Sequence, residues 1–321
     1  MRTFSLSLLF LLIFSTVVFA EEPIRVLTFN ILCAGWEPEP KKDHAWDKRL
    51  PIVIDVMKNS PNEKNENNPY DFIGTQETSN NPNKPEYHQV KQLADAMTGY
   101  GSLFAPCGGK LDKFSLSNMI FWKKDRWEID PNDSGTFWLS GTPEVPGSND
   151  WVEENKGGER NVTYGLFHEL GSNGRTGKKI YFFNTHLNVH VEIARLRSAV
   201  LIMDRIVNRK EKDAAVIVTG DFNALQSSPL IAYMQGAPLE FDGKTFNPSL
   251  SLIETFKAVH PDSTEFGTAH SYRGKISWDK KIDFIFVSDR LKPVAANVIL
   301  TKKNGLYPSD HLPVDAVLEW K

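Results

Sequence analysis

The chain of 321 residues has little cysteine, no excess of basic residues and, after its first twenty residues, no long apolar run. Its two cysteines, Cys33 and Cys107, are too few for a disulfide framework, and the sequence leaves open whether they bond to each other. The formal net charge of −3 is not the basic footprint of a protein that holds long nucleic acids through their phosphates. No later segment is long and apolar enough to cross a bilayer, so we expect no stable membrane association.

The first twenty residues have the pattern of a secretory signal peptide. Arg2 provides a positive start, residues 4–19 are almost wholly apolar, and Val18-Phe19-Ala20 offers a cleavage site. A transmembrane anchor is the alternative, but the apolar run is short for a membrane span. Because no cysteine follows the cleavage site, a lipoprotein is disfavoured as well. We therefore expect an exported protein, periplasmic or extracellular, with a signal peptide over residues 1–20.

Residues 21–321 are predicted to form a single domain. The sequence shows no low-complexity linker and no internal repeat that would divide them. This length is large for one core, but a sandwich of two sheets can reach it. Residues 138–160 are rich in glycine and proline and weakly periodic, which predicts a long surface loop near the functional site. We expect the protein to be a monomer.

Apolar periodicity predicts strands and helices that are interleaved irregularly. Helices are predicted over residues 47–59, 86–97, 191–209 and 229–234. Strands are predicted over residues 24–30, 71–75, 118–123, 162–169, 179–185, 214–219, 282–288 and 314–320. Several strands follow one another without a helix between them. This order favours a layered α/β sandwich with mixed or antiparallel sheets over a regular parallel barrel.

Polar side chains recur where the predicted strands end. They are Asn30, Glu77, His186, Asp221, Asn223, Asp283, Asp310 and His311. Taken singly, each has a plain structural explanation, because Asp and Asn are common in turns and a lone His is more often structural than catalytic. Together they supply what phosphoester hydrolysis needs. Carboxylates hold a hard divalent cation, a base activates water, and hydrogen-bond donors hold the phosphoryl oxygens.

Six short motifs contain these residues and stand in a fixed order. They are Leu27-Thr28-Phe29-Asn30, Thr75-Gln76-Glu77, Asn184-Thr185-His186-Leu187, Gly220-Asp221-Phe222-Asn223, Ile282-Asp283-Phe284-Ile285 and Ser309-Asp310-His311-Leu312-Pro313. Each is weak or moderate alone, but the ordered set resembles the endonuclease/exonuclease/phosphatase superfamily. This superfamily includes deoxyribonucleases, abasic-site endonucleases, inositol polyphosphate 5-phosphatases, neutral sphingomyelinases and deadenylases. The resemblance implies a four-layer α/β sandwich, with two packed mixed β-sheets flanked by helices and the site at one edge.

The resemblance also implies a metal site. Glu77 is expected to be the principal ligand, with Asn30 beside it, and Asp310 is expected to contribute as well. The expected cofactor is Mg²⁺, with Mn²⁺ or Ca²⁺ as alternatives, because carboxylate oxygens suit these hard cations better than zinc.

Five further residues are expected to carry the chemistry. Asp221 orients or deprotonates the attacking water with help from Asn223, and His311 acts as the general base or binds a phosphoryl oxygen, so the role of base is assigned to the two jointly. Asp283 orients the ring of His311, because an Asp that accepts a hydrogen bond from a His stabilises its charged form. His186 contacts the phosphate or assists the leaving group.

Three residues are second-rank candidates for substrate binding. Arg160 follows the long loop and could bind a phosphate bidentately, although a solvated Arg beside Glu159 is an equally good interpretation. His270 lies in a polar loop where the family often has a substrate-facing His. Asn118 opens a strand and could either orient a site residue or cap the strand. The loop aromatics could stack on a base or sugar, although packing is the more common role: Trp138, Trp151, Tyr272 and Trp278.

The sequence departs from two branches of the superfamily. Leu32 stands where abasic-site endonucleases carry Asp, and residues 220–223 lack the Trp that is usual in phosphoinositide phosphatases. Residues 30–32 and 135–140 look closest to exported bacterial members related to the deadenylase-like branch. We expect a secreted phosphodiesterase or nuclease that acts on nucleic acid or a nucleotide-like ester. The alternatives are a phosphatase or phospholipase C-like hydrolase of sugar phosphates, inositol phosphates or sphingolipids, and a catalytically silent binding module.

Overall fold

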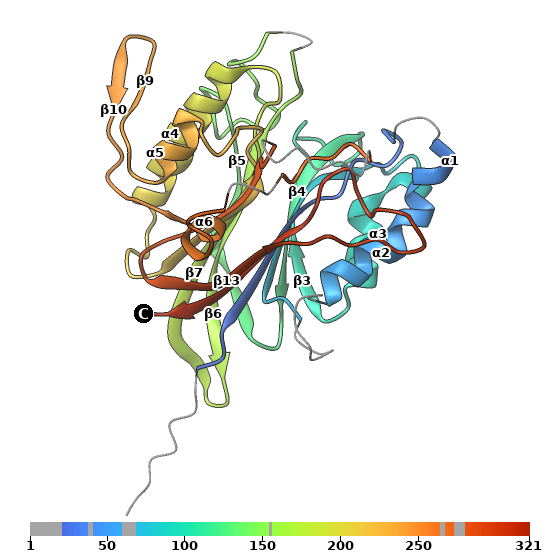
Figure 1. The fold of residues 1–321 in the computed structure, drawn as a ribbon, viewed down its shortest axis with the longest axis horizontal. Helices are drawn as coiled ribbons and strands as arrows, with labels where there is room; N and C mark the ends of the chain where they lie inside the picture. Colours follow the sequence, from blue (N-terminus) through green and yellow to red (C-terminus); the bar gives the residue numbers. More distant parts are fainter. Residues whose placement is uncertain (1–20, 38–40, 60–68, 154–155, 264–266, 273–279) are drawn as a thin grey trace, which may run out of the picture.

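The computed structural model describes residues 21–37, 41–59, 69–153, 156–263, 267–272 and 280–321. The predicted signal peptide and Trp278 lie outside these residues. Two six-stranded sheets pack face to face, and helices cover the outer side of each (Figure 1). This arrangement confirms the α/β sandwich predicted from the sequence.

The first sheet is mixed. Its strands are β1 (Ile24–Asn30), β2 (Phe72–Asn80), β3 (Tyr100–Leu103), β4 (Ser115–Lys123), β13 (Leu291–Val298) and β14 (Val314–Trp320). They lie in the order β13-β14-β1-β2-β4-β3, with β1 parallel to β2 and antiparallel to β14. On its outer side lie α1 (Lys41–His44), α2 (Trp46–Lys58), the 3₁₀ turn η1 (Pro85–Tyr87) and α3 (Gln89–Ala96).

The second sheet is also mixed. Its strands are β5 (Trp127–Trp138), β6 (Asn161–Gly171), β7 (Gly174–His186), β8 (Ala215–Asp221), β11 (Ile253–Glu254) and β12 (Asp283–Val287). They lie in the order β11-β12-β8-β7-β6-β5, with β7 parallel to β8. Helices α4 (Glu192–Val207) and α5 (Pro229–Met234) cover its outer side. The remaining elements are a hairpin of β9 (Leu239–Phe241) and β10 (Lys244–Phe246) and the short helix α6 (Thr255–Val259).

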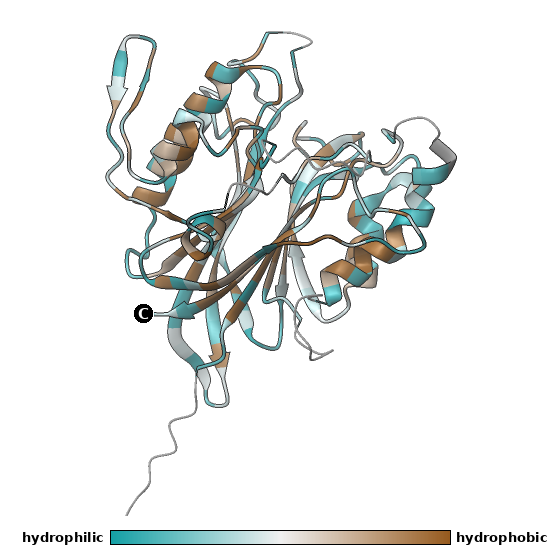
Figure 2. Cartoon of the chain, viewed as in Figure 1, coloured by the Kyte–Doolittle hydropathy of each residue, from teal (hydrophilic) through white to brown (hydrophobic). Residues whose placement is uncertain are grey.

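Strand alternation divides the core into layers. In β1, Leu27 and Phe29 pack against residues of α2, whereas Ile24 and Val26 face the second sheet. In β8, Val216 packs toward α4, and its neighbours in the strand face the first sheet. Figure 2 shows the hydrophobic residues gathered along the sheets and on the helix faces turned toward them. Every second residue of a strand therefore enters the layer between the sheets.

This layer between the sheets becomes polar toward one edge. Nε2 of Gln76 donates hydrogen bonds to Oγ1 of Thr28 at 3.0 Å and to Oδ1 of Asn184 at 2.7 Å. The Thr219 hydroxyl donates to the same Asn184 oxygen at 3.0 Å. A Cβ on Gly74 would lie 2.4 Å from this hydroxyl oxygen, so glycine allows the sheets to approach here. The buried polar network ties the two sheets together just below the edge that carries the predicted site.

Sequence reasoning missed strands that contain turn-forming residues or lie at sheet edges. Strand β5 includes Pro131 and has a register shift between Ile129 and Ser134, and β13 has a shift at Pro293. Proline and bulges interrupt the alternation on which a strand prediction depends. The helix predicted over residues 86–97 was wrong in its first turn, which is the separate element η1. Within the described residues, 139–160 form neither helix nor strand, as the predicted long loop requires.

The two cysteines are both buried and free, so no disulfide joins Cys33 and Cys107. No helix in the described part of the chain has the length and apolar character needed to span a bilayer.

Candidate functional site

Four of the predicted site residues stand at the ends of neighbouring strands. Asn30 closes β1, His186 closes β7, Asp221 closes β8, and Asp283 opens β12. In the strand register, His186 lies opposite Asp221, and Asp221 lies opposite Asp283. All four are buried. Because each occupies an inward-facing position of its strand, alternation brings them together at the polar edge between the sheets.

Glu77 reaches the same edge through a β-bulge. The register between β2 and β4 shifts between Thr75 and Thr78, and Glu77 itself has a φ of +58°. With regular alternation, the side chains of Gln76 and Glu77 would point to opposite faces of the sheet. The bulge instead turns the side chain of Glu77 toward the edge that carries the site. Its carboxylate consequently meets Asn30. The strand predicted to end at Thr75 in fact continues beyond the bulge, so that boundary was wrong.

Asn30 holds two carboxylates side by side. Its Nδ2 donates to Oε1 of Glu77 at 3.2 Å and to Oδ2 of Asp221 at 3.0 Å. Its Oδ1 accepts from the backbone N–H of Leu32 at 3.1 Å, and the N–H of Cys33 donates to Oε2 of Glu77 at 3.3 Å. In this orientation Asn30 positions Glu77. The role of Asn30 itself as a metal ligand stays a prediction.

His311 joins the site between two carboxylates. Its Nδ1 lies 2.9 Å from Oδ2 of Asp283 and 3.8 Å from Oδ2 of Asp221. Burial by itself lowers the pKa of His311, but Asp283, Asp221 and Asp310 together raise that pKa well above its usual value. Burial, with repulsion from Asp283, raises the pKa of Asp221 to about 7. The pair therefore consists of a charged imidazolium and a carboxylate that titrates near neutral pH, which suits acid–base chemistry.

His186 and Asn223 form the opposite wall. The N–H of Asn223 donates to Oδ1 of Asp221 at 2.9 Å, and its Nδ2 lies 2.9 Å from Nε2 of His186. The same amide donates to the carbonyl of Leu187 at 3.0 Å, which fixes its orientation. Burial, followed by the charges of Arg160 and His311, lowers the pKa of His186 well below its usual value. His186 is therefore neutral and suited to hydrogen bonding rather than to ion pairing.

Arg160 lies close enough to this wall to lower the pKa of His186, whereas Asn118 is hydrogen-bonded to Asn161. The guanidinium of Arg160 is buried, and its Nε has no hydrogen-bond partner among the described residues. Nδ2 of Asn118 donates to the carbonyl of Asn161 at 3.0 Å and to its Oδ1 at 2.8 Å. Asn118 thus holds the residue that follows Arg160.

Asp310 and His270 lie on adjacent loops beside the relay, which is the row formed by Asp283, His311 and Asp221. The carbonyl of Asp310 accepts from the N–H groups of His270 at 2.8 Å and Ser271 at 3.1 Å. Its half-buried carboxylate accepts from the hydroxyl of Ser309 at 3.3 Å. His270 is buried and packs against Tyr307 with ring centroids 4.5 Å apart, and burial lowers its pKa to about 4. The loop prediction for His270 therefore placed it next to the site.

The loop aromatics predicted as stacking candidates are mostly engaged elsewhere. Trp138 is buried and its indole N–H donates to the carbonyl of Cys107 at 2.6 Å, so it cannot stack on a substrate. Trp151 packs against the outer core of the second sheet. Tyr272 stacks on His44 with ring centroids 3.9 Å apart.

The profile of the endonuclease/exonuclease/phosphatase family matches residues 27–311, a range that contains every site residue described above. The chain belongs to this family. The sequence-based assignment to the endonuclease/exonuclease/phosphatase superfamily is therefore confirmed. Its members hydrolyse phosphoesters.

Solved structures of this family share the fold. A Bacteroides vulgatus endonuclease/exonuclease/phosphatase is 23% identical with a TM-score of 0.72, over 94% of this chain and 100% of that one. A mannosyl-6-phosphatase of Bacteroides thetaiotaomicron is 23% identical with a TM-score of 0.70, over 92% and 100%. The catalytic domain of human Nocturnin is 18% identical with a TM-score of 0.64, over 93% and 95%. No curated protein matches the sequence.

The chemistry of the donor set fits a hard divalent cation. The carboxylates of Asp221, Asp283 and Asp310 act on the imidazolium of His311, and Asn30 joins the carboxylate of Glu77 to that of Asp221. Asp221, Asp283 and His311 offer ligand atoms that lie within 4.8 Å of one another, and Oδ1 of Asp283 is buried without a hydrogen-bond partner among the described residues. Such an excess of negative charge is what Mg²⁺, Mn²⁺ or Ca²⁺ sites present.

Sequence reasoning missed Arg49, which ties together the loops of the site. Its buried guanidinium donates to the carbonyls of Ile31 at 2.6 Å, Leu32 at 3.2 Å and Pro308 at 2.9 Å, and it pairs with Glu37 at 3.0 Å. These loops follow Asn30 and precede Asp310. An arginine within a predicted amphipathic helix ordinarily indicates a solvated residue, so the sequence contained no signal for this role.

Proposed function

We propose that the protein is a divalent-metal-dependent phosphoester hydrolase that activates water with Asp221 and His311. One observation carries this proposal. The chain Asp283–His311–Asp221 continues through Asn30 to Glu77, so that an acid–base pair and a candidate metal ligand share one buried edge. Membership of a family of phosphoester hydrolases supports it.

The residues divide the reaction between them. Glu77 and Asp310 would hold the cation, which supplies positive charge to the phosphoryl oxygens. Asp221, whose pKa is about 7, accepts a proton from water as its oxygen attacks phosphorus. His311, kept charged by Asp283, donates a hydrogen bond to the phosphoryl group. The phosphorus–oxygen bond to the leaving alcohol breaks, the leaving oxygen takes a proton from solvent water, and Asp221 afterwards releases its proton to solvent.

The opposite wall binds the phosphoryl group. A neutral His186, fixed by Asn223, presents a hydrogen-bonding imidazole without adding charge. The unpaired Nε of Arg160 gives the same region a charged donor. Holding the ester in line with the attacking water is a large part of catalysis in phosphoryl transfer.

Two substrate classes are proposed. The first is the phosphodiester of a nucleic acid or nucleotide, as expected from the deadenylase-like motifs. The second is a phosphorylated carbohydrate, and a specific observation favours it. A hollow of about 680 Å³ beside the site is lined by aromatic rings and carboxylates, and the fold is shared with a mannosyl-6-phosphatase.

A substrate panel tests the proposal. Bis-p-nitrophenyl phosphate, short RNA and DNA, hexose phosphates and inositol phosphates are incubated with the protein in Mg²⁺ or Mn²⁺ and, separately, in chelator. The proposal expects metal-dependent hydrolysis of at least one ester and its loss in Asp221→Asn. No hydrolysis of any ester with either metal would contradict it.

Export to the periplasm or the extracellular space, and a monomeric state, stay predictions. The apolar leader supports the prediction of export. Mass spectrometry of the mature N-terminus and sedimentation of the purified protein test them. A processed N-terminus near Glu21 is the expected result.

A further inference from the structure

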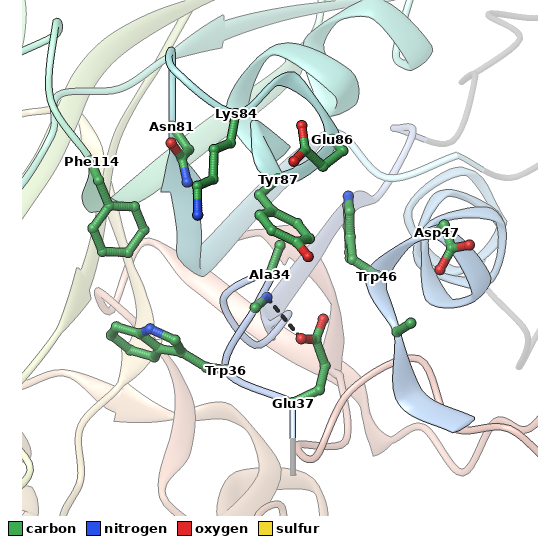
Figure 3. A pocket seen from close by; sticks show the side chains of 12 residues that line it. Ala34, Trp36, Glu37, Trp46, Asp47, Asn81, Lys84, Glu86, Tyr87 and Phe114 are labelled. Atoms are coloured by element: carbon green, nitrogen blue, oxygen red, sulfur yellow. Dashed lines mark hydrogen bonds between the residues drawn. The ribbon is translucent and has the colours of Figure 1, made fainter. Parts of the chain in front are cut away.

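Two exposed aromatic side chains line the hollow beside the site. Trp36 is 52% exposed and Phe114 is 47% exposed, and their rings meet edge to face with centroids 6.3 Å apart. Figure 3 shows them on one side of the hollow and Trp46 on the other, with Tyr87 and Lys84 between. Large exposed aromatics that gather in this way commonly mark a binding surface.

The hollow starts directly beside the metal ligand. Ala34 and Gly35 line it, and they follow Cys33, whose N–H donates to the Glu77 carboxylate at 3.3 Å. A phosphoester at the proposed site would therefore extend its alcohol portion toward Trp36. This position suits the hollow to recognising the alcohol portion of the phosphoester.

The lining of the hollow suits a neutral ring that carries hydroxyl groups. Asp47, Glu86 and Asn81 provide carboxylate and amide oxygens, which accept hydrogen bonds from hydroxyls. The Lys84 ammonium lies 5.9 Å from the ring centroid of Tyr87, within cation–π range. Carboxylates at the surface of the hollow would repel a second phosphate.

A second hollow has the opposite charge. It has about 440 Å³ and shares Trp36 and Phe114 with the first. Three basic residues line it, Lys110, Lys113 and Arg160, against one acid, Glu159. The aromatic pair thus separates a basic hollow, which favours anions, from one whose free charges are mainly acidic. A polynucleotide, with a phosphate on either side of each sugar, matches this asymmetry poorly.

We propose that the hollow between Trp36 and Trp46 binds the sugar ring of a phosphorylated carbohydrate, with the Trp36 ring against its C–H face and Phe114 supporting Trp36 edge to face. The inference rests on the proposed phosphoester hydrolysis and names its substrate class. Glu86 and Asp47 accept hydrogen bonds from the sugar hydroxyls. The phosphoryl group lies at Glu77 and the relay, outside the hollow.

Selectivity measured on matched esters tests this assignment. The substrates are glucose and mannose 6-phosphates with their methyl diesters, and ethyl phosphate with its methyl diester as ring-free references. Trp36→Ala and Glu86→Gln are expected to lower kcat/KM for the sugar esters about tenfold, a change of about 1.4 kcal/mol. The rate on the ethyl esters should stay within about twofold of wild type, because the reacting groups are untouched. Leu300→Ala, which removes an exposed apolar side chain outside both hollows, is the control and should change neither.

The outcomes separate this inference from the proposed function. Hydrolysis of the ring-free esters without preference for sugar esters, or an equal loss on both in Trp36→Ala, overturns the sugar assignment and leaves the hydrolase intact. A selective loss on adenosine 5′-phosphate esters in Trp36→Ala, with sugar esters unaffected, would show a base-stacking platform and also overturn it. Absence of hydrolysis of every ester contradicts the proposed function itself.

Discussion

Nδ1 of His311 lies 2.9 Å from one carboxylate, that of Asp283, and 3.8 Å from another, that of Asp221. The closer contact keeps the imidazole charged and fixes the tilt of its ring. The second carboxylate, whose pKa is raised to about 7, is left as the group that exchanges protons near neutral pH. The two buried acids therefore have different tasks although they share one histidine.

Asp283→Asn should lower kcat by about 10²–10⁴-fold, because the amide can neither stabilise the imidazolium nor fix its orientation. KM should change little, since Asp283 lies behind His311 and does not reach the substrate. Steady-state kinetics on an ester cleaved by the wild type measure both values. Asp289→Asn, an exposed acid just after the same strand, is the matched control. A kcat within about threefold of wild type in Asp283→Asn would rule out the relay.

Glu77→Gln should act through metal affinity. The amide keeps the shape but loses the charge, so the Mg²⁺ concentration for half-maximal activity should rise by about 10–100-fold. Activity at saturating metal should recover in part. A metal titration of activity distinguishes this from a loss of kcat alone, which would contradict the ligand role. Glu240→Gln, an exposed acid on β9, should behave as wild type.

Arg49→Met should destabilise the protein by about 3–5 kcal/mol, because it leaves the buried Glu37 unpaired and several loop carbonyls without a donor. The double variant Arg49→Met/Glu37→Gln should be less destabilised than the sum of the single variants. Urea unfolding of the four proteins gives the coupling free energy. Strict additivity would show that the pair does not act as a unit.

The buried His270 should make stability depend on pH. Its pKa is lowered to about 4, so between the ordinary value of 6.5 and pH 4 the unfolded chain binds a proton that the folded protein does not. Its contribution to stability is therefore present above pH 6.5 and is lost as the pH falls. From pH 7 to pH 5 the metal-free wild type should lose roughly 1–2 kcal/mol more than His270→Gln. Equal losses in urea unfolding would show that His270 is already protonated in the folded state.

Period-two alternation and motif order made much of the fold predictable. The strands over residues 24–30 and 314–320 and the helix over residues 229–234 have the predicted bounds, because regular apolar patterns end cleanly there. Polar residues at the predicted strand ends, among them Asp221 and Asp283, were expected to form one site, and the two lie opposite each other in the register. Sheet order puts their strands side by side, and that order depends on contacts distant in sequence.

The features that escaped prediction depend on backbone irregularity and long-range contacts. The bulge that turns Glu77 inward requires a residue with a left-handed backbone conformation in the middle of a strand. No local sequence pattern predicts such a conformation. Arg49 contacts Pro308, which lies 259 residues later in the sequence, so its role exists only in the folded protein. No sequence pattern singled out Trp36, which the fold places beside Phe114.

The most direct test is the rate of bis-p-nitrophenyl phosphate hydrolysis in Mg²⁺ by the wild type and by His311→Ala, each repeated in chelator. We expect metal-dependent activity in the wild type and a fall of at least about 10²-fold in His311→Ala, with thermal unfolding confirming that the variant is folded. A folded His311→Ala protein with near-wild-type, metal-dependent activity would contradict the proposed mechanism.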